Sequence, residues 1–200
     1  MSKILIGSNN PAKIATFQML LSEAGYEVIT PKQLGIFDEV EETGKTFKEN
    51  ALLKAQFFFD KSGLPTIADD GGIEIDALNG APGVYSHRWA GEPPTGISID
   101  QHLVDFTLQK LTNVPQGKRT ARIIGILCLI QPNEKPIFST ASIEGYITMQ
   151  QQAPINPGFP YRSIFFCPQL GKLLALATPE ELKKIDHRRE SIGNLLPYLP

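Results

Sequence analysis

The 200-residue sequence has only two cysteines, no marked excess of acidic or basic residues, and no long apolar run. Cys128 and Cys167 have no CxxC spacing and no His-x-x-His companion, which argues against a disulfide framework or a zinc motif. We expect both to be reduced thiols in a core. Nineteen basic residues against 21 acidic ones leave a net charge of -2, which argues against an extended cationic surface for nucleic acid.

No stretch of the sequence approaches the roughly 20 apolar residues that a membrane span requires. The apolar run at Ile4–Ile6 stops at Gly7 and is too short for a signal peptide. We therefore expect a cytoplasmic protein without a membrane partner. Hydrophobic residues make up 42% and charged residues 20%, as in ordinary globular proteins, and we predict a single domain over residues 1–200.

Strand and helix patterns alternate along the chain, which predicts an α/β fold with a mixed sheet flanked by helices. Asn10 is a suitable N-cap before Pro11, and Thr46 and Glu49 form a capping box. The segment 153–168 is expected to be a loop. The predicted strands are 3–7, 27–29, 65–68, 73–77, 119–130 and 137–148, the last two as a hairpin, and the predicted helices are 11–24, 46–60, 99–111 and 179 onward with a break near 186.

Three polar groups of residues stand out, and the first lies between the first strand and the first helix. Ser8, Asn9 and Asn10 are small polar residues at a helix start, where free backbone N–H groups attract anions, and Lys13 lies one turn further on. These residues could bind a phosphate. An Asn-capped turn with a solvated lysine is the alternative, because the sequence matches neither a Walker A loop nor a GxGxxG motif.

The second group is Asp69-Asp70-Gly71-Gly72, which we place at the end of a strand. Open α/β sheets bind ligands beyond the carboxyl ends of their strands, so one aspartate could bind a metal or act as a general base. Because side chains alternate along an extended chain, we expect only one of the two to face a given site. An ordinary Asp-Gly turn remains the alternative.

The third group is an acidic loop with Glu39, Glu41 and Glu42 shortly before the Thr46 cap. By itself it could be a solvated acidic surface. Together with the aspartates it could supply a second carboxylate for Mg²⁺, which prefers hard oxygen ligands and keeps several waters. The three groups suggest phosphate and Mg²⁺ chemistry without naming a substrate.

Four sequence blocks resemble the inosine/xanthosine triphosphate pyrophosphatase family. The blocks occur in the family's order and span nearly the whole chain. The third is the most specific, because a long match punctuated by glycine and proline rarely arises by chance. They are SNNPAK at 8–13, EETGxTFxENAxxKA at 41–55, ADDGGIxxxALxGAPGVYS at 68–86 and His187-Arg188.

The resemblance implies an elongated, two-lobed α/β fold with a cleft between the lobes, usually as a homodimer. It also implies Mg²⁺-dependent hydrolysis of non-standard purine nucleoside triphosphates (ITP, dITP, XTP) to the monophosphate and pyrophosphate. Glu42 and Asp70 would bind Mg²⁺, and Asp70 would also activate the attacking water. The residues implied to hold the triphosphate are Ser8, Asn9, Asn10, Lys13 and Lys54.

The resemblance is weaker where the family binds the base. Phe159 and Tyr161 are retained for stacking, and His187 and Arg188 for hydrogen bonds to a 6-oxo purine. A changed pocket would alter base preference, because an unmatched base leaves site groups unpaired. The departures are Gly71 in place of serine, Pro160 of glycine, Arg162 of an acid, Asp186 of serine and Leu182 of lysine, with Lys183 adjacent.

Two other functions remain open from the sequence. The altered base pocket is compatible with a divergent paralogue that has changed base specificity or that binds nucleotides with little turnover. The retained Asp70, Glu42, Lys13 and Lys54 argue against a pure binder. A nucleic-acid-binding module would need a basic stripe, and the charge balance provides none.

Overall fold

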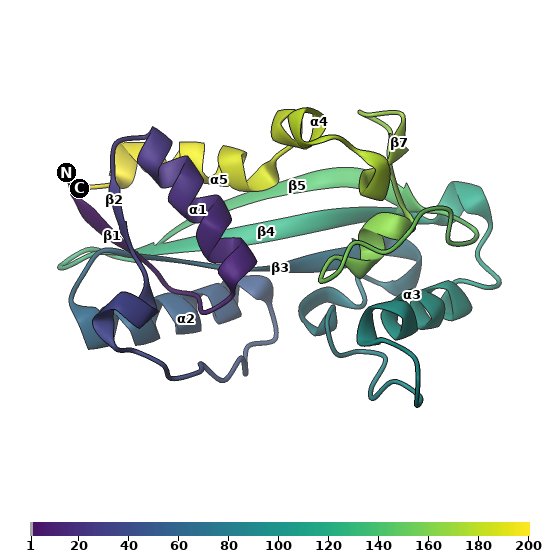
Figure 1. The fold of residues 1–200 in the computed structure, drawn as a ribbon, viewed down its shortest axis with the longest axis horizontal. Coiled ribbons are helices and arrows are strands. Elements are labelled where there is room, and N and C mark those ends of the chain that lie inside the picture. Colours follow the sequence, from purple (N-terminus) through teal and green to yellow (C-terminus); the bar gives the residue numbers. More distant parts are fainter. Residues whose placement is uncertain (1) are drawn as a thin grey trace. The chain divides into compact units, whose positions relative to one another are not determined.

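The computed structural model describes residues 2–200, with the backbone alone at Ala12. Its sheet has the strand order β2-β1-β3-β4-β5-β6-β7. The strands are β1 Lys3–Ile6, β2 Glu27–Ile29, β3 Thr66–Ile75, β4 Thr120–Ile130, β5 Ile137–Ile147, β6 Phe165–Cys167 and β7 Lys172–Leu173. The helices are α1 Pro11–Glu23, α2 Phe47–Ser62, α3 Ile99–Lys110, α4 Pro179–Lys184 and α5 His187–Leu195 (Figure 1).

The sheet is mixed, as predicted. β1 pairs in parallel with β2 and β3, whereas β6 pairs antiparallel with β5 and β7. β4 and β5 are neighbours joined by residues 131–136, too few for the crossover that parallel neighbours need, so they form the expected hairpin. The α/β fold class is therefore confirmed.

The chain divides into two compact units. Unit 1 is Met1–Gly71, Gly125–Ala141 and His187–Pro200, and unit 2 is Gly72–Ile124 and Ser142–Asp186. β3, β4 and β5 each give one part to each unit. That residues 1–200 form one domain with two lobes stays a prediction.

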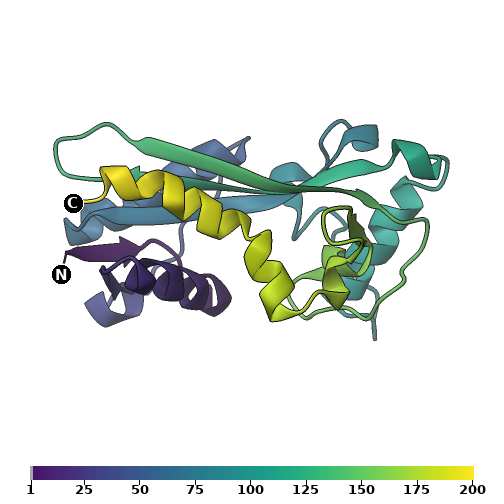
Figure 2. The same cartoon turned by 90° about the horizontal axis from the view of Figure 1, so that it is seen from above.

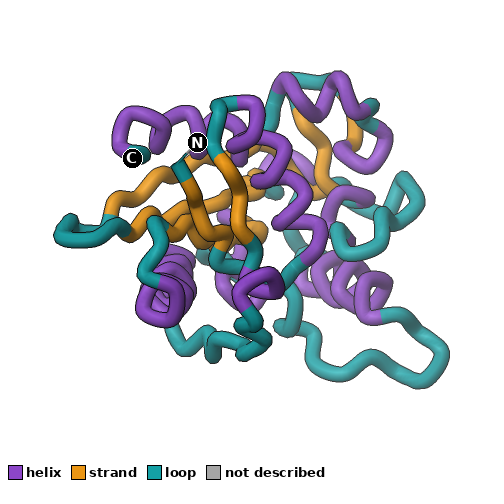
Figure 3. Tube along the Cα trace, turned by 60° about the vertical axis from the view of Figure 1, so that its left-hand side comes forward, coloured by secondary structure: helices purple, strands orange, loops and turns teal. Residues whose placement is uncertain are grey.

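In unit 1, alternate residues of the strands face different helices. α1 and α5 pack on one face of the strands and α2 on the other (Figures 1 and 3). Ile67 of β3 belongs to the cluster with α1 and α5, whereas the next residue, Ala68, packs with α2. The same alternation separates Leu127 from Cys128 in β4. This parity follows from the two-residue period of a strand.

α2 begins and ends at the residues that its sequence indicates. Thr46 accepts a hydrogen bond from the Glu49 N–H at 3.1 Å, and the Glu49 carboxylate accepts one from the Thr46 N–H at 3.1 Å, which completes the capping box. Gly63 ends the helix with a positive φ of 66°. α2 is thereby capped at both ends.

Unit 2 has one core, in which α3 and the segment 161–167 pack on β3, β4 and β5 (Figure 2). Arg119 is 1% exposed and donates to three main-chain carbonyls, those of Leu111, Val114 and Thr148, at 2.7, 2.8 and 2.9 Å. A guanidinium group here ties the end of α3 to the segment after β5.

Two sequence predictions are corrected by the structure. Asp69-Asp70-Gly71-Gly72 lies inside β3, not at the end of a strand. Gly72 serves a close approach there, because a Cβ would lie 2.2 Å from Ser86 Oγ, and that oxygen accepts from the Ile73 N–H at 2.9 Å. The segment 153–168, predicted as a loop, contains β6, whose three residues are too few for a periodic pattern.

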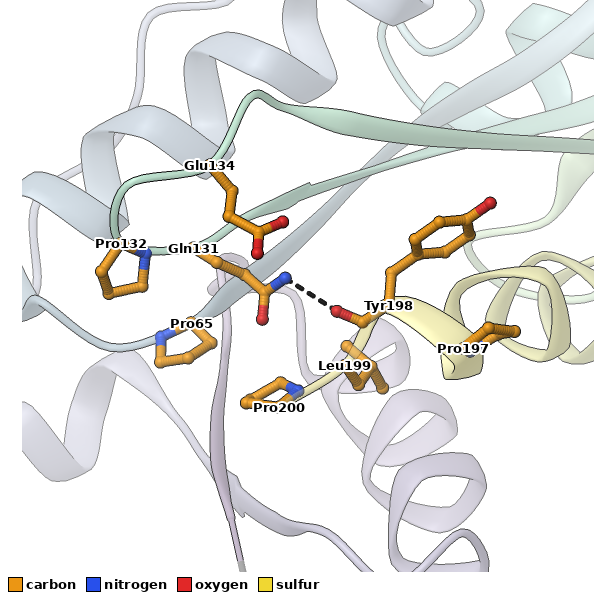
Figure 4. Close-up of a pocket in the computed structure, with 8 residues that line it drawn as sticks. All are labelled: Pro65, Gln131, Pro132, Glu134, Pro197, Tyr198, Leu199 and Pro200. Carbon is orange, nitrogen blue, oxygen red and sulfur yellow. Dashed lines mark hydrogen bonds between the residues drawn. The ribbon is translucent and has the colours of Figure 1, made fainter.

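Both cysteines are free and buried, as expected. Gln131 Nε2 donates to the Tyr198 carbonyl at 2.7 Å and ties the C-terminal segment to the β4–β5 connection, beside a pocket rich in proline (Figure 4). None of the predicted site residues lines that pocket. Within residues 2–200, no helix has both the length and the apolar character to cross a membrane.

Candidate active site

The turn between β1 and α1 has the local structure that its sequence predicts. Asn10 Oδ1 accepts from the Lys13 N–H at 3.3 Å and caps α1, and Ser8 Oγ accepts from the Asn10 N–H at 3.2 Å. Asn9 is exposed, and its side chain donates to the Asp38 carbonyl at 3.1 Å. The turn presents polar groups and the positive end of the α1 dipole, a suitable environment for an anion.

Asp69 lies on the α1 and α5 face of unit 1, in keeping with the parity of Ile67. Its Oδ1 is 2.9 Å from Lys13 Nζ and its Oδ2 is 3.7 Å from Arg188 Nε. Burial would raise the pKa of Asp69, but the charges of Lys13 and Arg188 outweigh that effect and hold the pKa below its usual value. Asp69 is therefore ionised and joins side chains from α1 and α5.

Asp70 lies on the opposite face, toward α2. Lys54 Nζ donates to Asp70 Oδ1 at 2.9 Å and to Glu42 Oε1 at 2.7 Å. Burial raises the pKa of Asp70, and the negative charge of Glu42 adds to the rise despite the opposing effect of Lys54. For Lys54, burial opposes the charged form, but the two carboxylates hold its pKa above the usual value. The two predicted metal ligands thus converge on one ammonium group.

The donor set suits a divalent metal ion that takes its other ligands from phosphate and water. Among residues 2–200, no group of three or more His, Cys, Asp or Glu side chains could hold a metal ion by itself. Mg²⁺ is commonly held by one or two carboxylates together with substrate phosphates and waters. Glu42 and Asp70 provide two convergent carboxylates of this kind, already organised around a positive charge.

His187 and Arg188 begin α5 in unit 1. His187 is 6% exposed, and its ring lies against Gly125 of β4, where a Cβ would be 3.1 Å from His187 Cδ2. Glycine at this position leaves room for the imidazole. Arg188 points toward Asp69. The two residues of the predicted base-reading pair are therefore held by different neighbours.

Phe159 and Tyr161 belong to unit 2 and differ in their surroundings. Tyr161 is 6% exposed, and its hydroxyl donates to the Ser86 carbonyl, so its ring is part of the unit 2 core. Phe159 is 36% exposed. The Arg162 guanidinium carbon lies 4.2 Å from the centroid of its ring. Of the two predicted stacking residues, Phe159 is the exposed one, and an arginine covers its ring.

Among the other departures, Leu182 packs against the unit 2 core, whereas Lys183 beside it is exposed. A long aliphatic side chain at 182 is explained by that packing. The substitution of Asp186 for serine has no explanation in the structure beyond its place in the break between α4 and α5.

The chain is similar to one known protein family along nearly its whole length. The model of the Ham1 family matches residues 4–198, nearly the whole chain. This chain belongs to the Ham1 family. The family resemblance in the sequence is thereby confirmed.

Curated relatives of this Ham1-family chain match it along its full length. A protein from Salmonella paratyphi A named dITP/XTP pyrophosphatase is 42% identical over 201 residues, which cover 100% of this chain and 98% of that protein. One of the same name from Halalkalibacterium halodurans is 35% identical, with 100% of both chains covered. The Staphylococcus aureus Ham1 protein structure has a TM-score of 0.85 at 35% identity, covering 98% of this chain and 97% of that chain.

Two positions of the Ham1-family chain were not singled out as site residues from the sequence. Asp69 was set aside because one aspartate of the pair was expected to face the site, yet it organises Lys13 and Arg188. Gly125 gives no sequence signal of its own, since a glycine in a strand is explained only by what lies over it. The two aspartates lie on separate faces of the strand, as the alternation of side chains predicts.

Proposed function

We propose that this protein hydrolyses nucleoside triphosphates of non-standard purines, such as dITP, ITP and XTP, to the monophosphate and pyrophosphate. Family membership supports the proposal, as does the name that its curated relatives carry. The observation that carries it is the convergence of Glu42 and Asp70 on Lys54. Two carboxylates around one ammonium group suit a reaction at a phosphate.

Phosphate binding is assigned to the β1–α1 turn and to two lysines. Ser8, Asn9 and Asn10 offer polar groups at the positive end of α1. Lys13 and Lys54 are held by Asp69 and Asp70, and each ammonium group has three donors that it can share with a phosphate oxygen. We assign the triphosphate to these five residues.

Asp70 is proposed as the general base. Burial raises its pKa in the metal-free protein, and its carboxylate can accept a proton from water. The water oxygen forms a bond to the α-phosphorus, the water proton passes to an oxygen of Asp70, and the bond to pyrophosphate breaks. Mg²⁺, which Glu42 and Asp70 would hold, supplies neutralisation of the phosphate charge.

Base recognition is proposed for Phe159, Tyr161, His187 and Arg188. Phe159, the more exposed of the two aromatic residues, would supply the stacking face, whereas Tyr161 is buried. The guanidinium of Arg162 over Phe159 specifically favours a changed base preference, because a base stacking on this ring meets a cation. A cytoplasmic location and a homodimer stay predictions.

The test is pyrophosphate release with Mg²⁺ from dITP, ITP, XTP, GTP, ATP and pyrimidine triphosphates. We expect release confined to the non-standard purines dITP, ITP and XTP. Asp70→Asn should lower turnover by about 10³-fold or more with binding nearly retained. Asp60→Asn, an exposed residue of α2, is the matched control. Binding without release from any triphosphate would leave the nucleotide-binding paralogue as the better description.

A further inference from the structure

Asn50 is a fully buried amide in the first turn of α2. Its relative exposure is 0%, and its neighbours on the buried face include Phe47 and Ala51. Its Oδ1 accepts from the Gly44 N–H at 2.8 Å, whereas its Nδ2 is buried with no hydrogen-bond partner within residues 2–200. An unpaired buried donor costs folding free energy that an apolar residue would avoid. Helix stability therefore does not account for asparagine here.

Gly44 lies directly on the start of α2. A Cβ at this position would be 2.5 Å from Asn50 Oδ1, 2.8 Å from Glu49 Cβ and 2.9 Å from the Asn50 backbone nitrogen. Two of these neighbours are fixed parts of the helix, so they cannot move aside. The loop can approach the helix this closely only with glycine. Gly44 and Asn50 together form what we call the loop clasp.

The loop clasp lies close to Glu42 in two ways: along the loop backbone, and through Lys54 of α2. Glu42 is two residues before Gly44, and the Thr43 N–H donates to the Glu41 carbonyl at 3.1 Å, which bends the backbone at Glu42. Lys54, which binds the Glu42 carboxylate, is one helical turn after Asn50 on the same buried face. Near Glu42, α2 thus holds the loop through Asn50 at the Gly44 N–H, through Glu49 at the Lys45 N–H (2.6 Å) and through Lys54 at the Glu42 carboxylate.

We propose that Asn50 is a positioning residue that sets Glu42 for catalysis, an inference that rests on the proposed function. The bond to Gly44 fixes the loop backbone before any ligand binds. Without it, the loop beside Glu42 would rely on the bond from the Lys45 N–H to Glu49 and on the contact of Glu42 with Lys54. Displacing a catalytic carboxylate by about 1 Å can lower the reaction rate by up to about 10²-fold. Asparagine supplies the acceptor without adding a further negative charge beside Glu42 and Asp70.

The direct test is amide hydrogen exchange of the Gly44 N–H in the metal-free protein. Asn50→Leu, which has a similar size but no acceptor, should speed this exchange by about tenfold or more, since the bond protects the amide. Asn50→Asp keeps an acceptor oxygen and should retain most of the protection. Unchanged exchange in Asn50→Leu would overturn the proposal, because the clasp would then not hold the loop.

The functional test compares kinetic constants. Asn50→Leu should lower kcat for dITP by about 10- to 100-fold and raise the Mg²⁺ concentration needed for half-maximal rate, with a smaller change in KM. Gly44→Ala should act in the same way, and the double variant should be no worse than the poorer single one, because both break one contact. Additive losses would contradict a shared clasp.

A purely structural role predicts a different result. Ser62 Oγ donates to the Phe58 carbonyl at 2.8 Å and accepts from the Leu64 N–H at 3.2 Å, so Ser62→Ala weakens the other end of α2. This control should lose stability but keep kcat. If it loses as much kcat as Asn50→Leu, positioning is refuted. Absence of wild-type turnover would instead refute the proposed function, and the Gly44 exchange would still test the clasp.

Discussion

Asp69 and Asp70 are consecutive residues of β3, yet each forms an ion pair with a lysine from a different helix. Asp69 meets Lys13 of α1 at 2.9 Å, and Asp70 meets Lys54 of α2, also at 2.9 Å. The pKa of Asp69 is lowered and that of Asp70 is raised, so the pKa values of these adjacent carboxylates shift in opposite directions. This separation assigns a structural anion to one face and the proposed base to the other.

Lys54→Met should destabilise the metal-free protein. The substitution leaves Asp70, whose side chain is 9% exposed, and Glu42 without their counter-charge. We expect the free energy of unfolding to fall by about 3 kcal/mol, since breaking a buried pair leaves an uncompensated charge. Urea denaturation at pH 7 measures the change. Lys118→Met, at an exposed lysine of unit 2, should change stability little, and an equal loss in both variants would contradict the assignment.

Arg119→Lys should destabilise unit 2 by about 3 kcal/mol. A single ammonium group cannot replace the donors to the carbonyls of Leu111, Val114 and Thr148. The Leu111 carbonyl keeps the Val114 N–H at 2.9 Å, but the other two lose the donors that Arg119 supplies. Thermal and urea denaturation report the loss. Arg122→Lys is the control, because that partly exposed arginine contacts carboxylates that a lysine can also reach. A stability change below about 1 kcal/mol for Arg119→Lys would show that the three bonds contribute little.

Cys128 should be unreactive in the native protein at neutral pH. Burial raises the pKa of its thiol to about 12, so the neutral form persists through the usual working range and thiolate appears only as the pH rises toward that value. A Cys167→Ser variant isolates this thiol. An aromatic disulfide reagent at pH 8 should label it only in denaturant, and rapid stoichiometric labelling of native protein would contradict the buried location.

Much of unit 1 could be predicted from the sequence, because its signals are local. The Thr46 capping box, Asn10 with Pro11, and Gly63 mark helix ends through contacts within a few residues. The Asp-Asp-Gly-Gly segment could not be placed correctly, since an Asp-Gly pair usually marks a turn. Ser86, 13 residues beyond Ile73, accepts from β3 and keeps the strand extended, and no local pattern shows that.

For the candidate site, the sequence indicates the residues but not the long-range contacts that hold them. The resemblance supplied Glu42, Lys54 and Asp70, and the structure brings these three together. Asn50 belongs to the block quoted for the resemblance, but its bond to Gly44 could not be predicted, because that bond depends on how the loop packs on the helix. Tyr161 looked like a free aromatic face, whereas long-range contacts bury it.

Because side chains alternate along β3, the face on which each carboxylate lies depends on the number of strand residues before it. Ile67 and Asp69 share one side of the strand, and Ala68 and Asp70 share the other. One residue inserted between Ile67 and Asp69 would move Asp69 to the place of Asp70, facing Lys54, and Asp70 to the place of Gly71, so that Lys13 would lose its carboxylate partner. The loops that flank β3 can change in length without this effect. An odd change in the number of residues before Asp69 within the strand would turn each of the two carboxylates to the other face of the sheet.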